Sequence, residues 1–177
     1  MEKRKLDVFY VVCEGKTECM YFEKLQKIYN LKIVIEEVGN HKLDKILKKG
    51  RSLKNKNKNK GIYFACFDIE HERATNDDGY KKIITKIQNK DNDKCNIFNY
   101  YLVTNRQFEQ WLQWHWDDTT CNPKNEFDET IKNKLNNKIK ELTENHITKA
   151  IDKAKTFNND CNRDLAFSTC HLIAKMF

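Results

Sequence analysis

Acidic side chains follow two apolar runs of the sequence, at the points where strands are expected to end. Glu14 comes directly after Val8–Cys13, and Asp68 and Glu70 come directly after Gly61–Phe67. Alternate residues of an extended segment point the same way, so Asp68 and Glu70 can present their carboxylates to one point. Carboxylates that share a site repel one another unless they bind a cation or take up protons. Such oxygen ligands suit Mg²⁺, with Mn²⁺ as the alternative, and we expect a divalent-metal site if the two segments are neighbours.

Solvation is the alternative explanation, because the ends of strands are often polar simply where they meet water. For Glu14 alone, or for Asp68 and Glu70 alone, solvation is the simpler interpretation. Both signals occur together, however, and the carboxyl ends of the strands form the ligand crevice in open parallel sheets. We therefore interpret the three carboxylates as one candidate metal and catalytic site.

The apolar segments predict the sheet that has to position these carboxylates. Continuous apolar runs, typical of strands buried on both faces, predict strands at 8–13, 31–38, 61–67 and 97–103. Helical spacing predicts helices between them, with Thr17 as a plausible cap of the first, the second at 44–53 and the third beginning near Asp78. The order predicts an α/β fold with a mostly parallel sheet of about four strands covered by helices.

The remainder of the chain is predicted to be helical. Apolar and aromatic residues recur at helical spacing over 108–116, 131–142 and 147–157, and a last helix is expected at 166–176, after a break at 158–160. We therefore divide the chain into an α/β core, 1–104, and a helical extension packed on it, 105–177.

The excess of positive charge is confined to one segment. The net charge is +7, and Lys42–Lys60 holds nine Lys or Arg residues and a single acid, Asp44. Such a segment on a near-neutral body suits a polyanion such as nucleic acid, but a solvated Lys/Asn-rich loop from biased composition explains it equally well. The interleaved run from Lys54 to Lys60 is expected to be mobile. The candidate nucleic-acid contacts are Lys16, Lys48, Lys49, Arg51, Lys54, Lys56, Lys58 and Lys60.

Composition favours a cytoplasmic protein without a membrane anchor. No apolar run approaches the ~18 residues of a membrane span, and the apolar stretch near the amino terminus is too short for a signal peptide. The seven cysteines include no Cys-x-x-Cys pair, and in a cytoplasmic protein we expect their thiols to be reduced.

Three blocks of the sequence, in order, closely resemble the RloB-like (AbiLii) family. They are Val12–Glu18 followed by Tyr21-Phe22, Phe67–His71, and Asn105–Leu112 with His115, and the ending Ser168–Ile173 is similar as well. The family is similar to Toprim proteins, which include primases, topoisomerases and nucleases. The resemblance implies a Toprim-like fold and an Mg²⁺ signature of Glu after the first strand and Asp-x-Asp after the third. Glu14, Asp68 and Glu70 fall on those positions.

The resemblance implies an Mg²⁺-dependent nuclease that acts in phage defence or abortive infection, together with an ABC/AAA-type ATPase from the same operon. Asp68 and Glu70 would hold the metal, and Glu14 would share it or act as a general base. The alternative is a non-catalytic nucleic-acid-binding or regulatory subunit, which Glu70 in place of the usual Asp favours slightly. A second departure is Arg106, which stands where the family usually has proline.

Three further residues are supporting candidates. Glu109 and His115 lie on the aromatic helix after the fourth strand, where they could position substrate or transfer a proton, and His71 could orient a phosphate or a metal-bound water. The alternatives are a core histidine beside Trp111 and Trp116 for His115, and a solvated loop residue for His71.

Overall fold

The computed structural model describes residues 7–39, 43–69, 97–105, 108–116, 129–160 and 170–176, and every structural statement below concerns these residues. The strands are β1 (Val8–Cys13), β2 (Lys32–Glu37), β3 (Ile62–Ile69) and β4 (Tyr100–Asn105). The α-helices are α1 (Lys16–Ile28), α2 (Leu43–Lys56), α5 (Phe108–Gln113), α6 (Glu129–Lys138) and α7 (Glu144–Asp160). Two 3₁₀ segments, η2 (Ile139–Glu141) and η3 (Cys170–Met176), complete the described elements.

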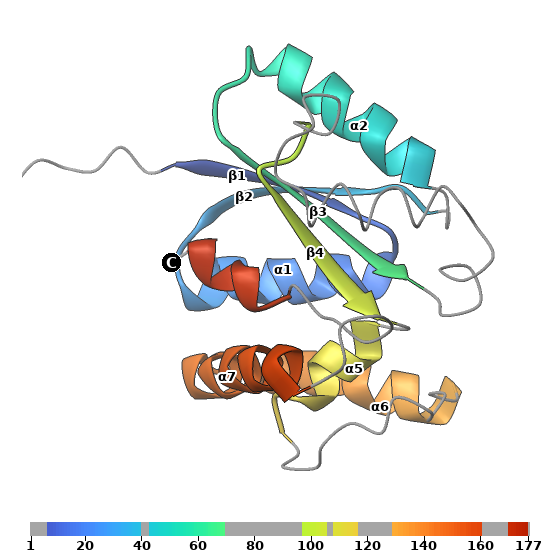
Figure 1. The fold of residues 1–177 in the computed structure, drawn as a ribbon, viewed down its shortest axis with the longest axis vertical. Coiled ribbons are helices and arrows are strands. Elements are labelled where there is room, and N and C mark those ends of the chain that lie inside the picture. Colours follow the sequence, from blue (N-terminus) through green and yellow to red (C-terminus); the bar gives the residue numbers. More distant parts are fainter. Residues whose placement is uncertain are drawn as a thin grey trace, which may run out of the picture.

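The four strands form one parallel sheet in the order β2-β1-β3-β4 (Figure 1). The expected α/β fold with a parallel sheet is therefore confirmed, and the first and third strands are neighbours. Cys13 at the end of β1 pairs with Cys66 of β3, and Asp68 of β3 pairs with Thr104 of β4. This register brings the two acidic segments of the sequence to the same end of two adjacent strands.

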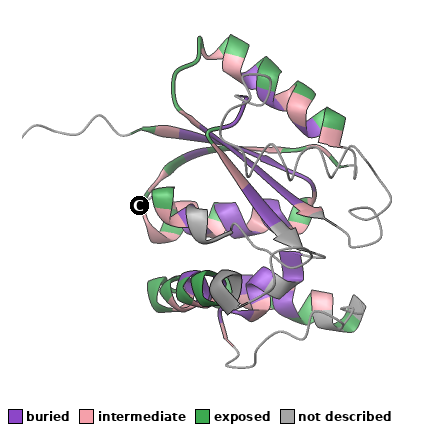
Figure 2. Cartoon of the chain, in the orientation of Figure 1, coloured by how far each residue is buried: buried purple, intermediate pink, exposed green. Residues whose placement is uncertain are grey.

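The continuous apolar runs arise because both faces of the sheet are covered. Val11 and Phe64 belong to a core shared with α1, whereas Val12 and Tyr63 belong to a second core shared with α2. Figure 2 shows the central strands as largely buried. Alternate residues of a strand point to opposite faces, so a strand covered on both sides is apolar at every position.

Helices form layers on the two sides of the sheet. In Figure 1, α2 lies on one side, α1 lies on the other, and α5, α6 and α7 lie beyond α1. Trp111 of α5, Ile147 of α7 and Ile173 of η3 belong to the same buried cluster as Val11 and Phe22. The carboxy-terminal helices thus complete the core on the α1 side.

Several boundaries differ from the sequence-based expectation. β3 continues to Ile69, so Asp68 lies inside the strand, where it pairs with β4. β4 begins at Tyr100, three residues later than expected. Helix α7 continues through 158–160, where a break was predicted, and the last segment is a 3₁₀ helix beginning at Cys170. The helix expected from Asp78 lies outside the described residues.

The Lys/Asn run that was expected to be mobile, and for which a solvated loop was one of two interpretations, forms the last turn of α2 and its cap. α2 extends to Lys56, and Asn57 donates from its side chain to the carbonyl of Leu53 at 2.8 Å. The N–H of Asn59 then donates to the carbonyl of Lys54 at 2.9 Å, with a φ of 58° at Asn59. Asparagine adopts this left-handed conformation more readily than most residues, which is why a run that resembles a loop can end a helix.

Candidate active site

Glu14 is fixed at the end of β1 by hydrogen bonds to both neighbouring strands. Its N–H donates to the carbonyl of Cys66 on β3 at 3.0 Å, and its carbonyl accepts from the N–H of Gly39, beyond β2, also at 3.0 Å. The residue is buried. The side chain of Glu14 therefore starts from a backbone position that the sheet determines.

A direct hydrogen bond joins Glu14 to Asp68. The N–H of Asp68 donates to Oε2 of Glu14 at 3.0 Å. The carboxylate of Asp68, which is half-buried, accepts from the N–H of Phe108 through Oδ2 at 2.9 Å. Asp68 thus occupies the start of α5, where a carboxylate satisfies an N–H group that has no partner within the helix.

Glu18 joins these carboxylates, although it was not among the residues predicted to form the site. It lies in the first turn of α1 and is 5% exposed. Burial, together with the charges of Glu14 and Glu109, raises the pKa of Glu18 from its usual 4.5 to about 7, against hydrogen bonds from the N–H groups of Glu18 and Gly15. The sequence signal was a Glu at the third helical position, which can reach back to the amino end of its helix.

Helix α5 brings Glu109 to the same cluster. Glu109 is buried in the first turn of α5, directly after the N–H group that Asp68 caps. Its charge acts on Glu18, so the carboxylates of β1, α1 and α5 share one electrostatic environment. Three acidic residues close together destabilise their charged forms unless a cation or protons compensate.

The side chains of this cluster are carboxylates, and carboxylate oxygens are the donor type that hard divalent cations prefer. Within the described ranges, no group of three or more His, Cys, Asp or Glu side chains is arranged to hold a metal ion. Glu14 and Asp68 supply part of the predicted set. Glu70, the predicted third ligand, and His71 lie outside the described residues.

His115 lies in the core rather than in the carboxylate cluster. It is fully buried, and its Nδ1 lies 2.9 Å from the carbonyl oxygen of Trp111 and 3.2 Å from that of Leu112. A carbonyl only accepts, so Nδ1 carries the proton, and Nε2 accepts from the hydroxyl of Tyr21 at 3.0 Å. Burial lowers the pKa of His115 to about 3. This geometry favours the alternative interpretation of His115 as a core histidine.

The basic candidates fall into two groups. Lys49 forms an ion pair with Glu36 of β2 at 3.0 Å, and the ammonium of Lys54 lies 5.7 Å from the centre of the Tyr63 ring. The others are exposed: Lys16 at the start of α1, Lys48, Arg51 and Lys56 on α2, and Lys58 and Lys60 after it. Neither the ion pair of Lys49 nor the ring contact of Lys54 involves a residue of this exposed group.

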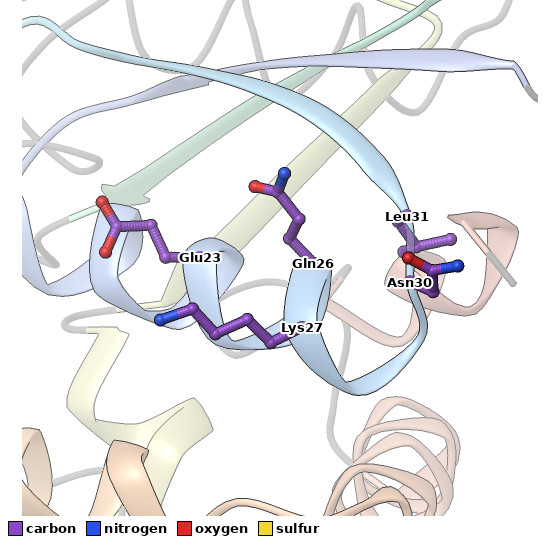
Figure 3. A pocket seen from close by; sticks show the side chains of 5 residues that line it. All are labelled: Glu23, Gln26, Lys27, Asn30 and Leu31. Atoms are coloured by element: carbon purple, nitrogen blue, oxygen red, sulfur yellow. The ribbon is translucent and has the colours of Figure 1, made fainter.

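A surface pocket lies away from the amino end of α1. Its volume is about 400 Å³, and it is lined by Glu23, Gln26, Lys27, Asn30 and Leu31 (Figure 3). These residues extend from the second half of α1 into the turn before β2, whereas Glu14 and Glu18 lie at the other end of that helix. The pocket therefore adds nothing to the carboxylate cluster.

The fold and the cluster define an α/β protein with an acidic site at the carboxyl ends of two parallel strands. The family model described as RloB-like protein matches residues 9–176. The chain therefore belongs to the RloB-like protein family. No curated protein and no solved structure matches it. None of the helices in the described ranges has the length and apolar character needed to cross a membrane.

Proposed function

We propose that this protein is a metal-dependent, Toprim-like nuclease that hydrolyses phosphodiester bonds in nucleic acid. The observation that carries the proposal is the contact between Glu14 and Asp68 at the carboxyl ends of neighbouring strands. Two sequence motifs far apart in the chain meet there, beside the buried carboxylates of Glu18 and Glu109. Family membership supports the same reading, because the motifs that resemble the family are the ones that meet.

Three carboxylates and two backbone N–H groups have roles in this proposal. Glu14 and Asp68, with Glu70, would hold Mg²⁺ or Mn²⁺, which when bound neutralises the scissile phosphate and lowers the pKa of an attacking water. The N–H of Phe108 orients the carboxylate of Asp68, and the N–H of Asp68 orients that of Glu14. Glu14 would also be placed to accept the proton of the attacking water, because its carboxylate contacts the backbone of Asp68.

The test is a cleavage assay on tRNA, single-stranded RNA and plasmid DNA, each with Mg²⁺, Mn²⁺, Ca²⁺ or EDTA. Cleavage is expected with Mg²⁺ or Mn²⁺ and absent in EDTA. Asp68→Asn should be inactive. Asparagine keeps a side-chain oxygen that can accept from the N–H of Phe108, so the variant removes the charge and retains the contact with α5.

The alternative proposal is a non-catalytic nucleic-acid-binding or regulatory subunit of a defence complex. Glu70 in place of Asp favours it, because the extra methylene displaces the carboxylate from the position that the family motif gives it. Calcium separates the two proposals, since it commonly fills carboxylate sites without supporting the chemistry. Binding that is equal in Mg²⁺ and Ca²⁺, with no cleavage in either, would identify a binding subunit.

The cellular part of the proposal is phage defence in the cytoplasm, together with an ABC/AAA-type ATPase from the same operon. A nuclease that damages nucleic acid of its own cell has to be restrained, and the helices that follow Asp117 would provide part of the docking surface. Residues such as Asn145, Thr148 and Asp152 give α7 an exposed polar face. Co-purification from the native operon is the test, and unregulated cleavage by the isolated chain without a stable partner would contradict it.

A further inference from the structure

One face of α2 consists of charged and hydrogen-bonding side chains. The exposed residues of this helix are Asp44, Lys45, Lys48, Arg51, Ser52, Asn55 and Lys56. At the 100° turn per residue of an α-helix, they fall within a single arc opposite the buried residues Ile46, Gly50 and Leu53. We call the cations of this arc, Lys45, Lys48, Arg51 and Lys56, the α2 stripe.

The α2 stripe is held in a fixed arrangement by the packing of the helix. Ile46 and Leu53 are buried in the core between α2 and the sheet, and Gly50 lets the helix approach Ile97 and Phe98 closely. Lys49, on the flank of the helix, is paired with Glu36 of β2. The backbone positions of cations on a helix anchored in this way are fixed: Lys45, Lys48 and Arg51 follow one another at intervals of three residues, and Lys56 comes five residues later. Such a linear array of charges suits the phosphates of a polyanion.

In Figure 1, α2 begins at the end of the sheet towards which β1 and β3 run, which is the end where Glu14 and Asp68 lie, and it leads away from that end. Val38 and Gly39, which follow β2, are bonded to the end of β1, because their N–H groups donate to the carbonyls of Cys13 and Glu14, both at 3.0 Å. The 14 residues of α2 span about 21 Å at 1.5 Å per residue. This length corresponds to about six base pairs of B-DNA at 3.4 Å per pair.

We propose that the α2 stripe binds the phosphate backbone of a nucleic-acid duplex that continues from the carboxylate site along this helix. The position of the duplex relative to the site rests on the proposed nuclease function, whereas the binding itself does not. Lys and Arg neutralise phosphates, and Ser52 and Asn55 can hydrogen-bond phosphate oxygens. Single strands are bound largely by stacking of bases on aromatic rings, whereas the exposed face of α2 has no aromatic residue and consists of four cations, Ser52, Asn55 and one acid, Asp44.

The test measures binding in EDTA, where cleavage does not interfere. Fluorescent duplexes of about one helical turn, roughly 10 base pairs, and the matching single strands are titrated over a salt series. The variant Lys48→Gln/Arg51→Gln/Lys56→Gln removes three charges of the α2 stripe. Its control, Lys27→Gln/Lys134→Gln/Lys140→Gln, removes three exposed charges from α1, α6 and η2, on the other side of the sheet.

The wild type is expected to bind the duplex more tightly than either single strand. The α2 variant should lose duplex affinity, and the slope of log affinity against log salt should become shallower by about 2 to 3 units, from roughly 0.9 per lost phosphate contact. The control variant should lose less affinity and change the slope less. Thermal unfolding of both variants at the wild-type temperature shows that their folds are retained.

Three results would overturn the proposal: no duplex binding by the wild type, equal or tighter binding of single strands, or the same salt slope in the α2 variant and the control. None of them depends on catalysis. Absence of cleavage in Mg²⁺ with duplex binding through α2 intact would overturn the nuclease function alone. Cleavage with an unchanged slope in the α2 variant would overturn the duplex proposal alone.

Discussion

Oε2 of Glu14 and the N–H of Asp68 form a hydrogen bond of 3.0 Å between residues that lie 54 positions apart in the sequence. The bond forms because β1 and β3 are adjacent and parallel, so that their carboxyl ends coincide. Asp68 in turn accepts from the N–H of Phe108. The ends of two strands and the start of α5 are therefore connected through the side chains proposed to act on the substrate.

Asp68 is expected to have a structural role that can be separated from its chemical one. Asp68→Ala removes the acceptor for the N–H of Phe108, whereas Asp68→Asn retains one. In EDTA, the alanine variant should be less stable than the asparagine variant by about 1 kcal/mol, the usual value of a helix cap. Urea unfolding measures the difference. Equal unfolding free energies would show that Asp68 does not cap α5 in solution.

Glu18 should make the metal-free protein less stable as the pH rises. Its pKa is about 7 in the folded protein and 4.5 in the absence of the fold, so the folded state binds the extra proton between these values. The resulting stabilisation is complete below about pH 4.5 and is lost as the pH rises through 7. Above pH 7, Glu18→Gln should therefore be more stable than the wild type in EDTA.

The advantage of Glu18→Gln should shrink as the pH falls towards 4.5, because the wild-type carboxyl is then protonated in the fold. Chemical denaturation of both proteins across this range, in EDTA, measures the trend. A constant difference at all pH values would mean that Glu18 does not titrate in the fold as the surrounding carboxylates require.

The effect of His115 on stability should be opposite to that of Glu18, because His115 should make the protein less stable as the pH falls. Burial lowers its pKa to about 3 from 6.5, so that the unfolded state takes up a proton that the folded state refuses between these values. Stability supplied by neutral His115 is therefore present above pH 6.5 and is lost as the pH falls towards 3. Replacement of His115 by Gln should weaken the loss of stability in acid, as followed by unfolding between pH 6.5 and 4.

The Tyr21–His115 hydrogen bond should matter for stability rather than for the reaction. Tyr21→Phe leaves the buried Nε2 of His115 without its donor, which should lower the free energy of unfolding by about 1–3 kcal/mol. The cleavage rate at a temperature where the variant is folded should match the wild type. A large loss of rate with normal stability would return His115 to the active site.

Gly50 should be intolerant of a side chain although it lies in a helix. A Cβ at this position would lie 2.8 Å from Cγ2 of Ile97, closer than packed carbon atoms approach. Gly50→Ala should lose about 1–3 kcal/mol to overpacking, more than the ~1 kcal/mol that alanine gains in helix propensity. Ser52→Ala, at an exposed position of the same helix, is the control and should be close to neutral in the same denaturation experiment.

The strands and helices predicted most accurately are those whose packing requires a distinctive pattern of apolar residues. β1 was predicted with its observed bounds, since a strand covered on both faces has to be apolar throughout. The end of β3 was misplaced, because Asp68 is a polar residue that continues the strand and pairs with Thr104. The cap of α2 was interpreted as a loop, because Lys and Asn indicate a loop unless the helix that precedes them is known.

The candidate site was predicted in part for a similar reason. Glu14 and Asp68 could be found because each follows an apolar run, and their proximity needed only the adjacency of two strands. Glu18 was missed because its raised pKa arises from burial and from the charges of Glu14 and Glu109, which only the folded chain brings to the first turn of α1. For His115, the two interpretations differed in whether the side chain points towards the carboxylate site or into the core. The structure places the ring in the core, beside Tyr21.

The proposed nuclease function requires that the carboxylates around Glu14 and Asp68 bind a divalent metal ion and that cleavage of nucleic acid depends on this ion. The most direct measurement is the cleavage rate of wild type and Asp68→Asn in Mg²⁺ and in EDTA, together with the metal-induced rise in melting temperature. The wild type should cleave nucleic acid and be stabilised by the metal, whereas Asp68→Asn should fold but show neither effect. Cleavage in EDTA, or an Asp68→Asn protein that retains both cleavage and the metal-induced shift, would contradict it.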